Sequence, residues 1–243
     1  MASPSIVTTN TTNGTTASTT PVLNLPAGTV TAGNTLLVMV RLATGTLGTW
    51  PAGWNEIFRD SSDAADDTTA IAWKKADGTE SGTTITMGAG TSAKFAAISW
   101  NISGADDPTT RAPECAAAAV GTTADLDPGT VTPTGGSKDY LFLYCGTCDG
   151  EPATWPPTGT PANYVTSIGA SSGTAGVTTT NVRACAASRQ TTASSENPGT
   201  WTMSSAPAQG WTATVVAVHP AIVVIPPPLP TIVKTAVQRA ANW

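Results

Sequence analysis

Few residues of this 243-residue chain could carry out chemistry, and the first of them are four cysteines, at positions 115, 145, 148 and 185. Cys145 and Cys148 form a C-x-x-C motif. A redox motif of this kind needs a strand that leads into a helix, whose N-terminus lowers the thiol pKa. The residues that follow, Asp-Gly-Glu-Pro, predict a loop instead. A zinc site needs a second such motif or a pair of histidines, and His219 is the only histidine. We therefore expect buried or optionally paired thiols, and the redox compartment stays open.

Acidic residues gather at 60–67, where four aspartates fall within eight residues. Carboxylate oxygens are the ligands that Ca²⁺ prefers, but the spacing differs from that of an EF-hand loop. A solvated loop between two strands is the favoured interpretation. The acidic pairs Asp106–Asp107 and Asp125–Asp127 receive the same interpretation, because a glycosidase pair needs a cleft and one raised pKa. No metal site is predicted.

The overall composition points away from catalysis and from nucleic acid. Charged residues make up only 11% of the chain, and 11 basic residues against 16 acidic ones give a net charge of −5. There is no basic footprint for nucleic acid and no apolar run long enough for a membrane helix. The first residues lack the basic and apolar regions of a secretory signal. His219 has no nucleophile motif beside it. We expect a non-enzymatic structural or binding protein without a cofactor.

Short apolar and β-branched runs predict an all-β body. The clearest are residues 36–40, 69–74, 83–87 and 94–102, each bounded by Gly, Asp, Asn or Pro. No sustained 3.6-residue periodicity appears before residue 230. The segment around residues 116–120 fits either a short helix or a strand.

The second half of the chain repeats the first. Residues 34–40 match 138–144, and Thr-Trp-Pro at 49–51 recurs at 154–156. Four more matches follow in the same order: 54–57 with 163–168, 70–73 with 181–186, 80–87 with 196–203, and 95–100 with 211–218. Two such halves, about 22–105 and 130–221, predict one β-sandwich body over residues 22–221. A jelly-roll-like arrangement is the favoured topology, and two consecutive small domains are the alternative.

Both ends of the sequence differ from this body. Residues 1–21 are polar and predict an extended N-terminal arm or an edge strand. Residues 222–243 combine an apolar burst, a polyproline stretch at 226–230 and a short amphipathic helix at 231–243. Because such a helix needs a surface to lie on, we interpret 222–243 as a C-terminal assembly arm. Its predicted interface residues are Ile222, Val223, Val224, Ile225, Leu229, Ile232, Val233, Val237 and Trp243.

Aromatic residues in the predicted loops allow two interpretations. Trp50, Trp54, Trp155 and Tyr164 could stack on sugars or anchor an interface, or they could plug the mouth of the sandwich. The plug is favoured because both halves place a Trp-Pro at the same point. The other tryptophans lie in predicted strands and are expected in the core: Trp73, Trp100, Trp201 and Trp211.

Four motifs in a fixed order resemble a known family. They are GNTLLV at 33–38, TWPAGW at 49–54, KKADGTE at 74–80 and ISGA at 102–105. This order is similar to that of a β-sandwich family, common in tailed-bacteriophage and prophage genomes and associated with virions. The resemblance covers about residues 21–221. It implies a virion component and supplies no catalytic residues.

Together these features predict a structural virion protein, made in the host cytoplasm. We expect a capsid decoration (cement) protein whose arms bind the major capsid protein or other virion subunits and that forms homo-oligomers in the assembly. The alternative is a receptor- or glycan-binding module of a tail fibre. Neither nucleic acid nor membrane is an expected partner.

Overall fold

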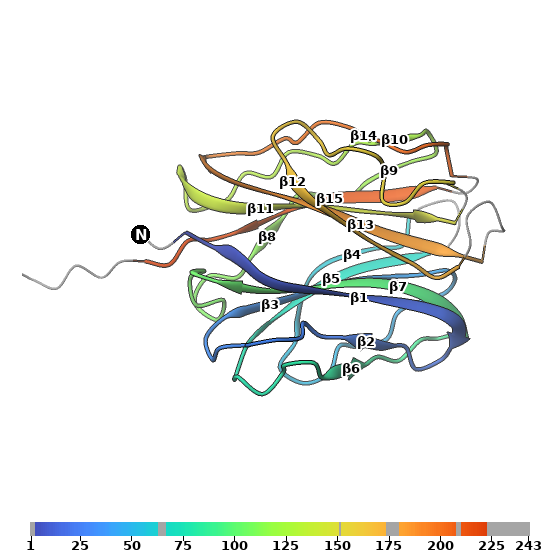
Figure 1. Ribbon diagram of the computed structural model, residues 1–243, viewed down its shortest axis with the longest axis horizontal. Helices are drawn as coiled ribbons and strands as arrows, with labels where there is room; N and C mark the ends of the chain where they lie inside the picture. Colours follow the sequence, from blue (N-terminus) through green and yellow to red (C-terminus); the bar gives the residue numbers. More distant parts are fainter. Residues whose placement is uncertain (1–2, 63–66, 151, 174–179, 208–209, 223–243) are drawn as a thin grey trace, which may run out of the picture.

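The computed structural model describes residues 3–62, 67–150, 152–173, 180–207 and 210–222, and their regular elements are all strands. The strands form two large antiparallel sheets that face each other, with a two-stranded ribbon outside each large sheet (Figure 1). The body is therefore an all-β sandwich with a thin extra layer on both sides.

The first half of the chain supplies one large sheet and one ribbon. The sheet has the order β1-β7-β3-β5-β4, and the ribbon pairs β2 with β6. The strands are β1 (Ser5–Ser18), β2 (Val22–Asn24), β3 (Thr35–Leu42), β4 (Asn55–Asp60), β5 (Thr68–Lys75), β6 (Thr84–Thr86) and β7 (Ala93–Ser103).

The second half builds the other large sheet and ribbon. This sheet has the order β12-β13-β11-β15-β8, with β9 also paired to β15, and the ribbon pairs β10 with β14. The strands are β8 (Glu114–Cys115), β9 (Ala119–Gly121), β10 (Asp125–Leu126), β11 (Lys138–Asp149), β12 (Val165–Ser171), β13 (Val182–Ala193), β14 (Trp201–Thr202) and β15 (Trp211–Val218).

The internal repeat is visible in the strand order. Reading β4-β5-β3-β7 against β12-β13-β11-β15 pairs each strand with the one the sequence repeat matched to it, and in the ribbons β6 corresponds to β14. β1 and β8 hold the same place in the two sheets, although the sequence repeat did not match them. Each large sheet comes wholly from one half. The interleaved halves of the expected jelly roll are not confirmed, because each strand of the large sheets pairs within its own half, even where its partner is not consecutive in the chain, as β7 with β1 and β3.

Three layers of core explain why the central strands are apolar on both faces. Between the large sheets, Leu37, Ile98, Leu143 and Val216 belong to one cluster drawn from both halves. Behind each large sheet, a second cluster packs against the ribbon of the same half. A strand covered on both faces reads as a continuous apolar run, and β3, β15 and most of β11 are buried along their length. The four tryptophans expected in the core are buried.

Of the two predictions for residues 1–21, an extended arm or an edge strand, the structure shows the edge strand for residues 5–18. Residues 5–18 form β1, which pairs with β7 from Ser5 opposite Ser103 to Ser18 opposite Ala93. Its threonines favour extended backbone, and most of its side chains are half-buried or exposed because it is an edge strand. Asn13 also accepts a hydrogen bond from the backbone N–H of Ser171, at 2.9 Å, so β1 contacts the second half.

Two other local predictions are resolved by strand pairing. Cys145 and Cys148 lie inside β11, not in a loop, because the ladder to β13 and β15 continues through them. The undecided segment near residues 116–120 ends in the edge strand β9. The predicted helix at 231–243 lies outside the described residues.

Candidate functional site

The strongest candidate site in the described chain is a surface patch made by Trp50, Trp54, Glu56 and Arg59, here called the tryptophan patch. The two tryptophans lie in the loop between β3 and β4, where a turn is closed by the Trp54 N–H donating to the Pro51 carbonyl at 3.1 Å. Gly53 occupies the left-handed region, with φ of 86°. The indole rings stack with centroids 6.0 Å apart and planes inclined by 27°. Both rings are half-buried.

Glu56 and Arg59, on β4, hold the polar side of the patch. The Trp50 Nε1–H donates to Glu56 Oε2 at 2.7 Å. Arg59 donates two hydrogen bonds to the same carboxylate, from Nε to Oε1 at 2.9 Å and from Nη2 to Oε2 at 2.7 Å. Its guanidinium also donates to the carbonyls of Leu47 and Gly48. This two-pronged geometry is the strong form of an arginine–carboxylate pair.

A β-bulge puts Glu56 and Arg59 on one side of the strand. Residues three apart in a regular strand point to opposite faces, but the register of β4 against β5 shifts between Glu56 and Phe58. Bulges re-aim side chains in this manner. Sequence analysis missed both residues because simple alternation separates them. The available signal was a pair of opposite charges shortly after the tryptophans.

The corresponding loop of the second half behaves differently. The Trp155 Nε1–H donates to the backbone carbonyl of Ala184 at 2.9 Å, and Arg183 lies over its ring at 5.9 Å. Tyr164 is only 3% exposed and packs edge-on against Tyr144. Trp155 is nevertheless partly exposed, as Trp50 and Trp54 are, so the halves differ chiefly at the second aromatic position, where Tyr164 is buried and Trp54 keeps part of its surface in solvent.

Ion pairs border the tryptophan patch. Lys74 contacts Glu80 at 2.8 Å and Asp77 at 3.2 Å. The hydrogen bond to Glu80 raises the pKa of Lys74, and hydrogen bonds from Thr79 lower the pKa of Asp77 to about 2. Glu196 occupies the position of Glu80 in the second half and pairs with Arg189 at 2.8 Å. This second pair indicates that the buried glutamate belongs to the repeated fold.

The acidic loop is only partly solvated, contrary to expectation. Asp67 is 1% exposed and accepts hydrogen bonds from Arg41 Nε and Nη2, at 3.1 and 2.7 Å. Arg41 is fully buried between the large sheets and also donates to Thr69 and, across the halves, to Thr147. Asp67 thus neutralises a buried cation. Residues 63–66 lie outside the described residues.

His219 is buried at the junction of the halves. Its Nε2 lies 2.8 Å from Glu114 Oε1, and its ring meets Tyr140 edge-on. Burial lowers the pKa of His219. Burial would raise the pKa of Glu114, but hydrogen bonds from Thr134 and His219 outweigh it and hold that pKa below its usual value. Glu114 and Tyr140 thus both contact the buried imidazole.

The cysteines are thiols in unreactive surroundings. Cys145 lies in the core between the sheets and Cys148 in the core behind the second sheet, so one strand points them in opposite directions. Burial raises the pKa of Cys145 and Cys185 well above that of a free thiol, and desolvation raises the pKa of Cys115 to about 12. A thiolate nucleophile is therefore disfavoured at each of these positions.

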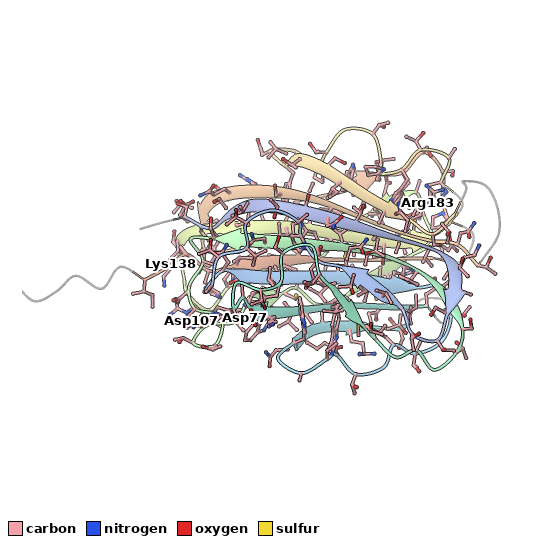
Figure 2. All side chains as sticks on the ribbon, turned by 60° about the horizontal axis from the view of Figure 1, so that its bottom comes forward. Asp77, Asp107, Lys138 and Arg183 are labelled. Atoms are coloured by element: carbon pink, nitrogen blue, oxygen red, sulfur yellow. The ribbon has the colours of Figure 1, made fainter. Side chains whose placement is uncertain are left out.

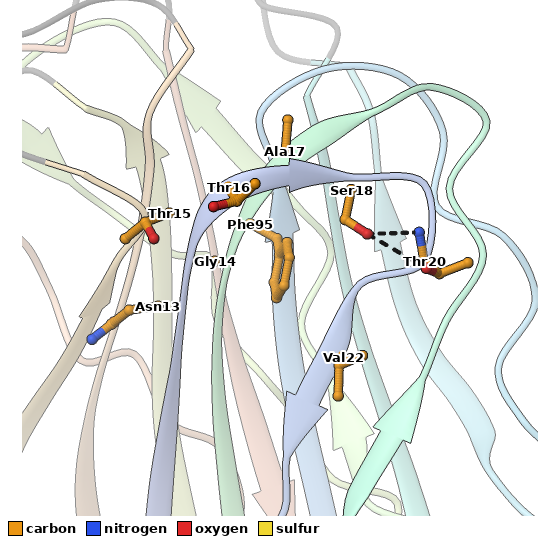
Figure 3. Close-up of a pocket in the computed structure, with 9 residues that line it drawn as sticks. All are labelled: Asn13, Gly14, Thr15, Thr16, Ala17, Ser18, Thr20, Val22 and Phe95. Atoms are coloured by element: carbon orange, nitrogen blue, oxygen red, sulfur yellow. Dashed lines mark hydrogen bonds between the residues drawn. The ribbon is translucent and has the colours of Figure 1, made fainter.

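A shallow hollow lies where the end of β1 turns away from β7 (Figure 3). Its lining comes from residues 13–18, Thr20, Val22 and Phe95, and contains hydroxyls, methyls and one amide but no charged side chain. The Thr20 N–H donates to Ser18 Oγ at 3.0 Å across its rim. This lining offers less to a ligand than the tryptophan patch does.

Comparison with known proteins gives no relative to guide the choice of site. The chain matches no protein-family model, no curated protein and no solved structure. The candidate site therefore depends on geometry alone.

Of the nine interface residues predicted from sequence, only Ile222 is described, and it is 52% exposed. The other eight lie outside the described residues, so the structure neither joins nor separates them. Within the described ranges, no three His, Cys, Asp or Glu side chains are placed to hold a metal ion. The same ranges hold no helix that is long and apolar enough to span a membrane.

Proposed function

We propose that this chain is a structural virion protein, specifically a capsid decoration protein that binds neighbouring subunits through residues 222–243. The order of sequence motifs supports the virion assignment, and the low charge content suits a protein largely covered by neighbours. In this proposal the β-sandwich is the rigid body and 222–243 is the attachment segment.

The observation that carries the proposal is the way the chain leaves the body. Ala105 bridges to Pro220, and the Ala221 N–H donates to the Gly104 carbonyl at 3.0 Å. The next residue, Ile222, is more than half exposed and begins an apolar sequence. The described chain starts and ends at the same end of the body (Figure 1). A fixed exit point at an exposed apolar residue, from which an apolar sequence continues, suits an attachment segment.

The contacts of the basic side chains support a structural role as well. Arg41, His219 and Arg189 each contact a carboxylate within the body, at distances of 2.7 to 2.8 Å. These side chains are thus used for contacts within the body. Asp107 and Lys138 mark the end where the chain leaves, and Arg183 marks the opposite end (Figure 2).

The test is particle binding by the full chain and by a variant without residues 223–243. Purified particles from cells that make the protein are separated on a density gradient, and its copy number is measured on heads and on tails. We expect many copies on heads, and we expect the truncated chain to remain folded and to stay at the top of the gradient. A few copies on tails only, or full binding by the truncated chain, would contradict the proposal.

Replacement of Ile222 by Asp is the matched point variant, because this side chain is already exposed and its loss leaves the body intact. Val120→Asp is the control, since Val120 is 44% exposed and its strand, β9, pairs with the start of β15 at Thr212, away from the end of β15 where the chain leaves. Ile222→Asp should weaken particle binding, and Val120→Asp should not.

A further inference from the structure

We propose that the tryptophan patch is a binding site for neutral oligosaccharides built from pyranose rings. The inference is independent of the assembly role, because it rests on Trp50, Trp54, Glu56 and Arg59 and makes no use of residues 222–243.

The internal repeat provides the first argument. Both halves place aromatic residues in the loop before β4 or β12, and the second half buries one of them, Tyr164, while Trp155 donates to a backbone carbonyl. In the first half, Trp54 packs on two core clusters, yet it and Trp50 both stay partly exposed and stack on each other. Contact between aromatic surface and water is unfavourable, so a ligand that covers the exposed part of the two stacked rings would be stabilised.

Rigidity is the second argument. The Trp50 indole is fixed by its hydrogen bond to Glu56, and Glu56 is fixed by Arg59, which is itself fixed by the carbonyls of Leu47 and Gly48. A site held in its binding geometry before the ligand arrives loses little conformational entropy on binding. Tryptophan adds a broad apolar contact with few rotatable bonds.

The polar groups at the patch fit a sugar hydroxyl. Glu56 and Arg59 are 31% and 33% exposed. A carboxylate oxygen has more than one lone pair and a guanidinium carries five N–H donors, so both retain capacity beyond the bonds described. A sugar hydroxyl can donate a hydrogen bond to the Glu56 carboxylate and accept one from the Arg59 guanidinium. The aliphatic C–H face of a pyranose can meanwhile lie on an indole ring.

Charge selects a neutral ligand. Arg59 and Lys74 are positive, whereas Glu56, Asp77 and Glu80 are negative, so these five side chains sum to −1. An anionic glycan or a nucleotide would be repelled, and the whole chain is acidic as well. Aromatic stacking with no net positive charge therefore favours a neutral sugar over a nucleic acid base.

The experiment is isothermal titration of the full chain with three neutral hexasaccharides: cellohexaose, maltohexaose and N-acetylated chitohexaose. At least one should bind with a dissociation constant in the micromolar to millimolar range. Trp50→Ala should lower the affinity for that sugar about tenfold or more, as expected for the loss of one stacked ring. No measurable binding of any of the three at millimolar concentration would overturn the proposal.

Two further variants keep the test decisive if Trp50→Ala folds poorly. Glu56→Ala removes the polar anchor at a partly exposed position and should also weaken binding about tenfold. Trp155→Phe is the matched control in the second half and should bind like the parent chain. Binding that survives Glu56→Ala, or that is lost equally in Trp155→Phe, would place the sugar elsewhere and overturn the assignment.

Discussion

Arg41 brings a full positive charge between the two large sheets, where its side chain is shielded from water. Its contacts reach Asp67 and Thr69 in its own half and Thr147 in the other. A buried ion pair adds little net stability compared with an apolar pair, but losing one partner leaves an uncompensated charge. The pair therefore specifies how the halves meet more than it strengthens their contact.

Arg41→Met should lower the free energy of unfolding by about 3–5 kcal/mol in urea titrations. The double variant Arg41→Met/Asp67→Leu should recover most of that loss, because no charge is then left buried. Lys75→Met is the control, since Lys75 and Asp107 are about 40% exposed and such pairs contribute about 1 kcal/mol or less. A double variant no more stable than the single would contradict this account.

The only histidine makes stability depend on pH. Because burial lowers the pKa of His219 below 6.5, the unfolded chain binds this proton more readily than the folded chain. Stability should be complete above pH 6.5 and fall as the pH drops through the folded pKa. Glu114, with its pKa held below 4.5, adds a further loss at lower pH.

We expect the melting temperature to fall between pH 7 and pH 5, and His219→Gln to remove most of that fall. Differential scanning calorimetry at half-unit pH steps measures both. The reference is Lys75→Met, which leaves the histidine in place and should keep the parent's slope. A parent protein whose melting temperature is flat across this range would refute the prediction.

At the scale of single strands, β1 shows how one small residue permits pairing. Gly14 lies opposite Phe95, and a Cβ built on Gly14 would lie 2.5 Å from ring atoms of that phenylalanine. The ring is buried beneath the strand at the hollow described above. Any side chain at position 14 must displace either the ring or the strand.

Gly14→Ala should therefore cost about 1–3 kcal/mol of stability, as overpacking does. Thermal unfolding with Gly88→Ala as control measures it, because a Cβ on Gly88 meets nothing within 4 Å. Adding Phe95→Leu to Gly14→Ala should return part of the loss. If Gly14→Ala and Gly88→Ala lower the stability equally, contact with Phe95 is not the cause of the loss.

The central strands could be predicted from sequence and the edges could not, for a physical reason. β3, β5 and β7 are covered on both faces, so their apolar runs are long and bounded by turns. β1 is held mainly by backbone pairing to β7, which is distant in sequence. Its Thr and Asn side chains do not indicate which strand it pairs with. Pairing of this kind is set by the whole fold.

The candidate site was predicted in part. Its tryptophans were recognisable from type and from the repeat, but Glu56 and Arg59 join them only because a bulge breaks the alternation of β4. Cys145 and Cys148 show the opposite error: glycine and aspartate near them suggested a loop, and cross-strand pairing on both sides overrode that local preference.

For the whole molecule, the core between the large sheets makes the halves interdependent. Trp73, Trp100 and Ile102 of the first half share it with Leu141, Val182 and Val218 of the second. A half on its own would expose this entire face to water. Each half nevertheless keeps a smaller core against its own ribbon.

Residues 1–113 and 114–243 produced separately should each lack a sharp thermal transition, whereas the two mixed during refolding should regain one near that of the intact chain. Calorimetry and near-ultraviolet circular dichroism test this. The intact chain should unfold in a single step. A separate half that melts cooperatively would instead support two consecutive domains.

The matching strand order of the two halves has an evolutionary consequence. A single ancestral half would have needed a second copy to cover its inner face, so it would have existed as a dimer of identical subunits. Fusing two gene copies turns such a dimer interface into an internal core and frees each half from the constraint of being identical. The differing loops fit that history: Tyr164 is buried in one copy, whereas Trp54 in the other stacks on Trp50 and keeps part of its surface in solvent.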